Sequence, residues 1–371
     1  MTITAQLALD SVQRLFDAEL RRGIETGVQL SVSHRGEVVE LAVGGNGNGQ
    51  PMTSQTYVPW TCSSKPLGAL AFARAWEAGL LDLDTAVSAV LPEYTGGGKE
   101  LVTVRDLLSH TTGMADPIMS LGAGAGQVSS MAEFDALIWS VICAVPTELQ
   151  PGTAMIYNPV TNWFVLDRVL TTLTGAQPGD SYRGLLDRLG LAASLGSPPV
   201  PGEQLVTVSA SADQQAGLAA MQLASALPLP GVGVWGSMRD LRVVGEVLLA
   251  KGVHHGEQLV GKASVEALVA TRWPGSGHRS ICDTDFPYGL GVMTLPVMFG
   301  RRCSVRAFGH AGGNTSTLLV DPLFDLVVAV YWNGRLDDVT TFARRYALVR
   351  ALYHDLGIPR LPVRGARPAT D

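Results

Sequence analysis

The stretch that decides the fold is residues 60–66, which read Trp-Thr-Cys-Ser-Ser-Lys-Pro. Apolar side chains then recur at helical spacing from Leu67 until Gly79, which predicts a helix that begins at Cys62. Residues three apart share one face of a helix, so Cys62 and Lys65 should point into the same space. A helix N-terminus also favours developing negative charge. The pattern therefore indicates a thiol nucleophile with an amine one turn away.

Two later segments make this short spacing informative, because a nucleophile three residues before a lysine is common by chance. Residues 157–159 read Tyr-Asn-Pro and precede a predicted helix over 163–173. Residues 310–313 read His-Ala-Gly-Gly and lead into a predicted strand over 316–320. The three segments are informative through their order, although each alone is a weak signal.

Together the segments resemble the motifs of the β-lactamase-like and penicillin-binding-protein-like superfamily, specifically its esterase and transacylase branch with a His-x-Gly third motif. The resemblance implies catalytic roles for Cys62, Lys65 and Tyr157. It also implies an oxyanion hole formed by the backbone N–H groups of Cys62 and Gly313. It covers most of the chain and includes residues 80–84, 103–113, 288–291 and 308–310.

Two positions depart from the pattern of that superfamily. Cys62 stands where the nucleophilic serine is expected, and Pro159 stands where β-lactamases with a Tyr-x-Asn motif carry asparagine. An ordinary thiol titrates near pH 8.5 and an ordinary amine near 10.4, a gap that favours thiolate and ammonium by roughly 2.6 kcal/mol in water. Burial opposes both charges. We therefore predict a resting ion pair of Cys62 and Lys65, with Tyr157 as a proton relay.

Composition and periodicity fit this resemblance. The chain has 371 residues, of which 46% are hydrophobic and 16% charged. Strand patterns occur near both ends and helical patterns between them, which suggests one α/β lobe built from both termini and one inserted helical lobe. The resemblance implies the matching α+β fold of the serine-β-lactamase type, an antiparallel sheet flanked by helices plus an inserted helical lobe. The expected limits are a single domain over 1–371, an α/β lobe over about 1–61 and 285–371, and a helical lobe over about 62–284.

Charge and cysteine usage limit the partners. The net charge is −6 with no basic stripe, so nucleic acid is not expected. The first twenty residues form one amphipathic stripe rather than a signal peptide, and no apolar run reaches membrane-spanning length. The four cysteines show no paired spacing. We expect a cytoplasmic protein without membrane partner, metal or cofactor.

The substrate would lie between the lobes. The resemblance places His310 and Gly312 at the substrate, and the neighbouring loops supply Trp273, Phe286 and Met119 as apolar walls. This mixture suits an apolar acyl chain or ring. The expected partners are a small-molecule acyl donor and acceptor, with an acyl thioester carrier as one candidate donor.

Three functions fit these residues. The favoured one is an acyltransferase in which Cys62 takes an acyl group from an ester or thioester and passes it to an amine or alcohol, with a role in secondary metabolism suggested by the resemblance. The alternatives are a hydrolase of small esters or amides and a non-catalytic binding protein. Three residues also have simpler interpretations: Cys62 as a small buried side chain or an engineered replacement of serine, Tyr157 as a core aromatic and His310 as a structural imidazole.

Overall fold

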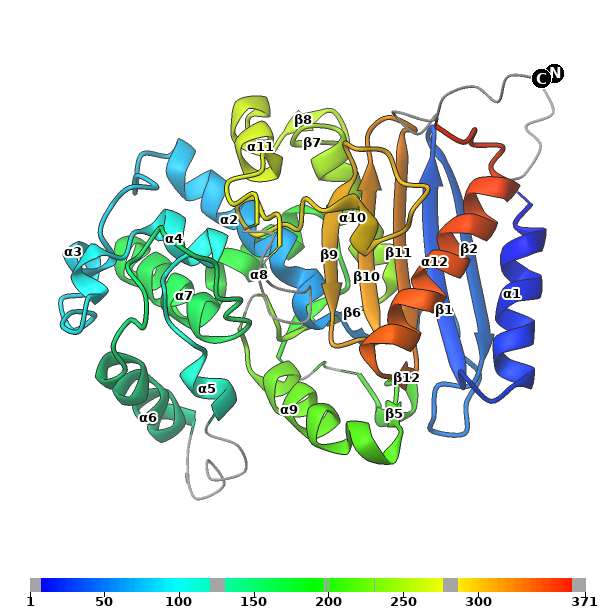
Figure 1. Cartoon of the computed structure of the whole chain (residues 1–371), viewed down its shortest axis with the longest axis horizontal. Helices are drawn as coiled ribbons and strands as arrows, with labels where there is room; N and C mark the ends of the chain where they lie inside the picture. Colours follow the sequence, from blue (N-terminus) through cyan, green and yellow to red (C-terminus); the bar gives the residue numbers. More distant parts are fainter. Residues whose placement is uncertain are drawn as a thin grey trace, which may run out of the picture.

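The computed structural model describes residues 8–120, 131–196, 198, 200–229, 231–275 and 286–361. Its centre is a five-stranded antiparallel sheet in the order β2-β1-β11-β10-β9 (Figure 1). The strands are β1 (Gly27–His34), β2 (Glu37–Gly44), β9 (Phe308–Gly312), β10 (Ser316–Asp321) and β11 (Leu326–Trp332). The predicted fold class is confirmed.

The sheet is built from the two ends of the chain. β1 and β2 form a hairpin whose turn residues Arg35 and Gly36 both have positive φ, at 53° and 83°, as the tight turns of twisted hairpins require. β1 then pairs with β11, so that Leu30 lies opposite Val330. Every residue of β1 is buried, because helices cover both faces of this strand.

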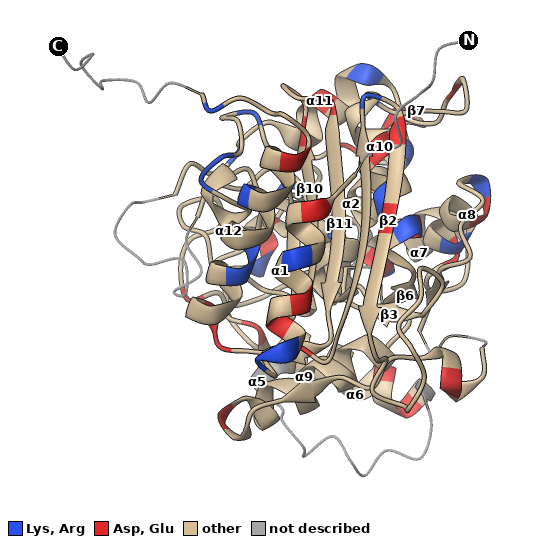
Figure 2. Ribbon diagram, turned by 90° about the vertical axis from the view of Figure 1, so that its right-hand side faces the viewer, with Lys and Arg blue, Asp and Glu red and all other residues tan. Residues whose placement is uncertain are grey.

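Two layers of helices enclose the sheet. α1 (Asp10–Arg21) and α12 (Asp338–Asp355) lie side by side on one face, where Phe16 and Leu352 contribute to the core (Figures 1 and 2). α10 (Met238–Leu249) packs on the other face against β1, β10 and β11. It presents a buried apolar stripe that includes Leu241 and Val244.

The remaining helices gather on one side of the sheet (Figure 1). The central helix of this group is α2 (Lys65–Glu77), which is buried along most of its length. Gly68 permits close packing there, since a β-carbon at this position would lie 2.1 Å from the ring of Trp163. The other helices are α3 (Val87–Val90), α4 (Val104–Ser109), α5 (Pro117–Ser120), α6 (Met131–Ala144), α7 (Thr161–Thr174), α8 (Asp180–Arg188), α9 (Gln215–Ala226) and α11 (Lys262–Val269).

Short strands connect the helical elements. They are β3 (Val58–Pro59), β4 (Ser194–Leu195), β5 (Ser209–Ala210), β6 (Val234–Gly236), β7 (Val253–His254), β8 (Glu257–Gln258) and β12 (Gly334–Arg335). The limits of the two lobes stay a prediction. α10 falls within the range expected for the helical lobe, yet it packs on the sheet because its apolar stripe matches the sheet's inner face. Among the described residues, no helix has the length and hydropathy needed to cross a membrane.

Candidate active site

Cys62 lies on a short 3₁₀ turn, η1 (Thr61–Ser64), that leads directly into α2. The preceding residue, Thr61, has a φ of 47°, a conformation that non-glycine residues adopt rarely and mostly at functional turns. Cys62 is half-buried and lines a cavity of about 230 Å³. The turn therefore presents the thiol to this cavity at the start of a helix.

Lys65 lies one turn after Cys62 and is completely buried. Its Nζ donates hydrogen bonds to the carbonyl oxygens of Pro159, at 2.9 Å, and Gly231, at 2.7 Å. Burial lowers the pKa of Lys65, while the Cys62 thiol and the Asp116 carboxylate act in the opposite direction. The two carbonyl oxygens take two of the three donors of the ammonium and leave one for the neighbouring Cys62 sulfur, so Lys65 can exchange a proton with the thiol.

Tyr157 completes this group of side chains. Its hydroxyl is buried, makes no close hydrogen bond in the described part of the chain, and interacts with the Cys62 side chain. Burial first, and then the charge of the Cys62 thiolate, raises the pKa of Tyr157 well above its ordinary value. Lys65 Nζ lies 5.7 Å from the centre of the Tyr157 ring. The phenol therefore stays neutral and can donate or relay a proton beside the thiol.

His110 supports the segment that carries Tyr157. Burial lowers the pKa of His110 well below its ordinary value, so the ring is neutral. Its Nδ1 can then accept the backbone N–H of Asn158 at 3.2 Å. The His110 and Tyr157 rings lie 4.5 Å apart. Asp116 accepts the backbone N–H groups of Val160, at 2.8 Å, and Thr161, at 3.1 Å, which anchors the start of α7.

The end of β9 lies directly against the nucleophile turn. A β-carbon at Gly312 would lie 2.2 Å from Thr61 Oγ1 and 2.6 Å from the Cys62 backbone nitrogen. Gly313 follows with a φ of 57°, and its carbonyl oxygen accepts a hydrogen bond of 2.7 Å from Arg335. In the described ranges, neither the Cys62 nor the Gly313 N–H donates to a carbonyl in a turn or loop. These two donors are thus available to an oxyanion.

A family model described as Beta-lactamase matches residues 12–352. The chain belongs to the beta-lactamase family. Two curated relatives illustrate its range. A putative D-alanyl-D-alanine carboxypeptidase of Escherichia coli (strain K12) is 24% identical over 270 residues, which cover 65% of this chain and 59% of that protein. The esterase EstB of Burkholderia gladioli is 34% identical over 127 residues, covering 32% of this chain and 31% of EstB.

The fold is similar to solved structures of the family. EstCE1, described as a hydrolase with promiscuous acyltransferase activity, has a TM-score of 0.75 and 20% identity, and the match covers 93% of this chain and 98% of that one. At this identity the similarity shows the fold alone. The chain spans about three-fifths of the length of the curated carboxypeptidase that it matches. Family membership and esterase relatives are therefore established, while the activity is a matter for proposal.

The structure brings part of the predicted site of this beta-lactamase family member together at one cavity. Cys62, Tyr157, Phe286, Gly312 and Gly313 line the cavity together. Lys65, behind Cys62, is not itself on the cavity wall.

Three predicted substrate contacts lie elsewhere. His310 is completely buried, with its Nε2 2.9 Å from the Tyr288 hydroxyl, and it is not on the cavity wall. Trp273 is also absent from that wall and forms an isolated β-bridge with Tyr288. Met119 belongs to α5, but its side chain lies outside the described residues. Substrate contact by these three residues stays a prediction.

The sequence analysis missed the wall of the cavity that faces the sheet edge. This wall comes from the β9–β10 turn with Asn314 and from α12 with Asp338, Phe342 and Arg345. Helical periodicity alone cannot show which face of α12 lies over the cavity. The one available signal was a consecutive pair of arginines inside a helix with many apolar residues.

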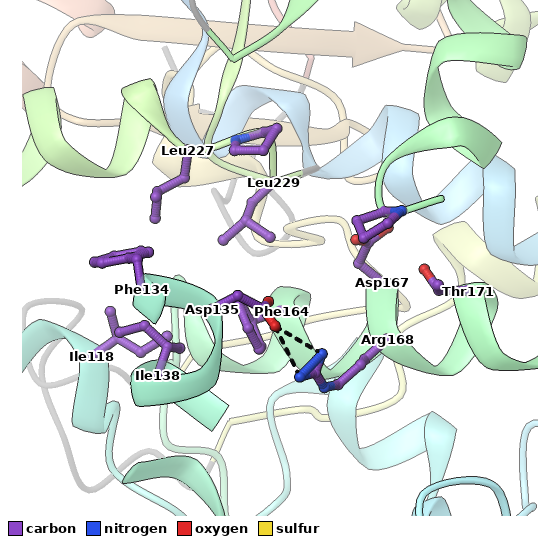
Figure 3. Close-up of a pocket in the computed structure, with 12 residues that line it drawn as sticks. Ile118, Phe134, Asp135, Ile138, Phe164, Asp167, Arg168, Thr171, Leu227 and Leu229 are labelled. Atoms are coloured by element: carbon purple, nitrogen blue, oxygen red, sulfur yellow. Dashed lines mark hydrogen bonds and ion pairs between the residues drawn. The ribbon is translucent and has the colours of Figure 1, made fainter. Parts of the chain in front are cut away.

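A second cavity, of about 80 Å³, lies in the helical lobe (Figure 3). Its walls include Phe134, Phe164 and Leu229, with the ion pair of Arg168 and Asp135 at its edge. None of the predicted site residues lines it. The cavity beside Cys62 is therefore the candidate active site.

Proposed function

We propose that the protein is an acyltransferase that works through an acyl-Cys62 thioester, taking the acyl group from an ester or thioester and passing it to an amine or alcohol. The observation that carries this proposal is the arrangement around the thiol. Cys62 faces a cavity, a buried lysine without a salt bridge among the described residues lies one turn behind it, and the Tyr157 hydroxyl is buried beside the thiol. Each feature costs stability, which is expected where the groups serve chemistry.

In the first step, the Cys62 sulfur attacks the carbonyl carbon of the donor, and Lys65 holds the thiol proton. The backbone N–H groups of Cys62 and Gly313 stabilise the negative charge on the carbonyl oxygen. The new C–S bond replaces the bond to the leaving alcohol or thiol. Tyr157 passes a proton to the leaving group, and Lys65 returns its proton to Tyr157.

In the second step, the acceptor reverses this sequence. Tyr157 passes its own proton to Lys65 and takes a proton from the acceptor amine or alcohol as the acceptor nitrogen or oxygen attacks the thioester carbon. The C–S bond breaks and Cys62 leaves as a thiolate, which recovers a proton through Lys65. The product is an amide or an ester.

Hydrolysis is the second candidate, since water can replace the acceptor in the same step, and the family relatives include an esterase. The thiol favours transfer, because thioesters react with amines more readily relative to water than oxygen esters do. A non-catalytic binding role is less well supported, since binding alone gives no reason to bury Lys65 beside a thiol. A thioester carrier as donor, a cytoplasmic location and a role in secondary metabolism remain predictions.

The Cys62→Ser variant tests this proposal. Wild type and variant are compared on a thioester and an oxygen ester with the same acyl group, each with and without an amine acceptor. We expect the variant to fold but to transfer poorly from the thioester, with its remaining turnover shifted toward water and higher pH, because the serine hydroxyl needs a neutral Lys65 as base. A serine variant that is the faster enzyme on simple esters with unchanged acceptor preference would contradict the proposal and indicate a serine-type esterase.

A further inference from the structure

Four arginines line a further cavity, which lies along α12 and has a volume of about 520 Å³. This arginine cavity is named for Arg301, Arg302, Arg350 and Arg360. Among the described residues, no carboxylate lines it and none of the four forms an ion pair, whereas the buried Arg344 of the same helix pairs with Glu25. Guanidinium groups are always charged, so four of them around one space repel each other. Such a cluster in a chain with a net charge of −6 indicates an anionic ligand.

Two of these arginines are held in place by neighbouring groups. The guanidinium carbon of Arg302 lies 5.6 Å from the centre of the Tyr353 ring, and its Nη2 donates a hydrogen bond of 2.5 Å to the Ile358 carbonyl oxygen. The guanidinium carbon of Arg301 lies 5.8 Å from the centre of the Tyr346 ring. Within the described chain, neither Arg301 nor the Nη1 of Arg302 makes a hydrogen bond. Both side chains are therefore oriented, while most of their donors stay free for a ligand.

The composition of this wall suits a nucleotide. Tyr346 lines the cavity beside the small residues Ala343 and Ala347, so a planar base can stack on its ring. Arginine binds phosphate through two parallel hydrogen bonds, and several arginines match several phosphates better than they match one carboxylate. The volume of about 520 Å³ falls within the roughly 300–1,000 Å³ of small-molecule sites. A nucleoside with two or more phosphates is therefore the ligand that this cavity fits best.

The arginine cavity adjoins the cavity that contains Cys62. Phe342 lines the Cys62 cavity, Tyr346 lines the arginine cavity, and their ring centres are 6.3 Å apart. Met298 and Arg301, three residues apart in the chain, likewise line the first and the second cavity. Four residues of a helix rise about 6 Å, so the two cavities follow each other along α12 at about one turn. One extended molecule can therefore occupy both.

We propose that the arginine cavity binds the phosphates of the acyl donor. This donor is a thioester of a thiol whose flexible chain ends in a nucleoside polyphosphate, the chemistry of coenzyme A. The inference rests on the proposed function, because it takes the Cys62 cavity as the place where the thioester reacts. The phosphates would hold the thiol part of the donor, while the acyl carbonyl lies beside Cys62. Binding of the remote phosphates then raises kcat/KM without contact to the reacting atoms.

Two thioesters with the same acyl group test the inference. Hexanoyl-coenzyme A carries the phosphates and the nucleoside, and the hexanoyl thioester of N-acetylcysteamine has the same reacting end without them. The ratio of kcat/KM for the first to that for the second is measured in wild type, in Arg301→Gln/Arg350→Gln and in Arg301→Lys/Arg350→Lys. Arg21→Gln/Arg22→Gln is the matched control, since it removes two exposed arginines at the end of α1.

We expect wild type and the control to prefer hexanoyl-coenzyme A. The double glutamine variant should lower the ratio roughly ten- to hundredfold, the worth of hydrogen bonds to a charged group. The double lysine variant should keep part of the preference, because an ammonium still binds phosphate as a point charge. Both variants should fold, since Arg301 and Arg350 are exposed. Equal loss on the two thioesters, or an unchanged ratio, would overturn the inference.

A binding measurement separates this inference from the proposed function. Titration calorimetry measures the affinity for adenosine 3′,5′-bisphosphate, which is part of coenzyme A, and for adenosine, which lacks the phosphates. We expect wild type, the control and Cys62→Ala to bind the bisphosphate much more tightly than adenosine. Arg301→Gln/Arg350→Gln should lose this difference.

The two measurements together give distinct outcomes. If both thioesters acylate Cys62 equally well and the bisphosphate does not bind, the proposed function stands and the inference is refuted. If the bisphosphate binds through the arginines but neither thioester reacts, the proposed function fails and the phosphate site stands. Binding of the bisphosphate together with equal reaction of the two thioesters would assign the phosphates to a ligand other than the donor, and would overturn the inference.

Discussion

The backbone of Gly312 passes so close to Cys62 that a β-carbon at residue 312 would lie 2.6 Å from the Cys62 nitrogen. Gly312→Ala should therefore push β9 away from the nucleophile turn and separate the two proposed oxyanion donors. We expect a loss of about 1–3 kcal/mol in the free energy of unfolding, as overpacking usually costs. Activity should fall by about two orders of magnitude or more, because one misplaced oxyanion donor alone has that effect.

Gly184→Ala is the matched control. Gly184 lies in α8, and its added methyl group would have no atom within 4 Å. This variant should be more stable by about 0.5–1 kcal/mol and fully active, since alanine favours a helix interior. Chemical unfolding measures the stability of both variants, and ester turnover measures their activity. Normal activity in a folded Gly312→Ala protein would contradict the proposed oxyanion hole.

Tyr157→Phe removes only the buried hydroxyl beside the thiol. Because this hydroxyl makes no close hydrogen bond in the described structure and interacts only weakly with the Cys62 sulfur, its loss should leave the stability unchanged or slightly higher. The rate of acyl transfer should fall by roughly two to four orders of magnitude if the hydroxyl relays protons. Single-turnover rates with one activated ester test this. Activity within threefold of wild type would remove Tyr157 from the mechanism.

Alkylation should distinguish Cys62 from the other described cysteines at neutral pH. Burial raises the pKa of Cys143 and raises that of Cys303 to about 12, which keeps both as unreactive thiols. Cys62 lines the cavity next to Lys65 and should react first with iodoacetamide. Peptide mapping after a short exposure measures the labelling at each site. Equal labelling of all cysteines, or labelling of other cysteines but not of Cys62, would contradict the role of Cys62 as nucleophile. Cys282 lies outside the described residues.

Glu19 predicts a pH dependence of stability. It is 7% exposed, and burial together with the nearby Glu25 raises the pKa of Glu19 from 4.5 to about 7. The folded protein therefore binds this proton more tightly than the unfolded chain, so stability falls as the pH rises from 4.5 to 7. Glu19→Gln should be more stable than wild type at pH 8 by on the order of 1–3 kcal/mol, and by much less at pH 5.

Urea unfolding at the two pH values measures this difference. Glu37→Gln, which changes an exposed glutamate of β2, is the control and should retain the pH dependence of wild type. If Glu19→Gln keeps the wild-type difference in stability between pH 5 and pH 8, as the control should, the raised pKa of Glu19 is contradicted.

Local spacing was sufficient to predict part of the site. Cys62 and Lys65 share one turn, and the Tyr157 and Gly312 segments were found because each motif is a few contiguous residues. His310 shows the limit of this approach. Side chains alternate between the two faces of a strand, so Ala311 lines the cavity while its neighbour His310 does not.

Arg345 could not have been placed from the sequence. Neighbouring residues of a helix point about 100° apart, so only one member of the Arg344–Arg345 pair can reach Glu25. Which member does so depends on how α12 lies against the β9–β10 turn. That orientation results from long-range packing of the two chain ends and has no local sequence signal.

The central claim is that Cys62 carries the acyl group. Its most direct test is to incubate the protein with an activated thioester, quench rapidly in acid and map the added mass by peptide analysis. We predict one acyl group per protein, bound at Cys62, removed by hydroxylamine and by an amine acceptor, and absent from Cys62→Ala. An acyl group at another residue, or turnover of the thioester by Cys62→Ala at the wild-type rate, would contradict the account.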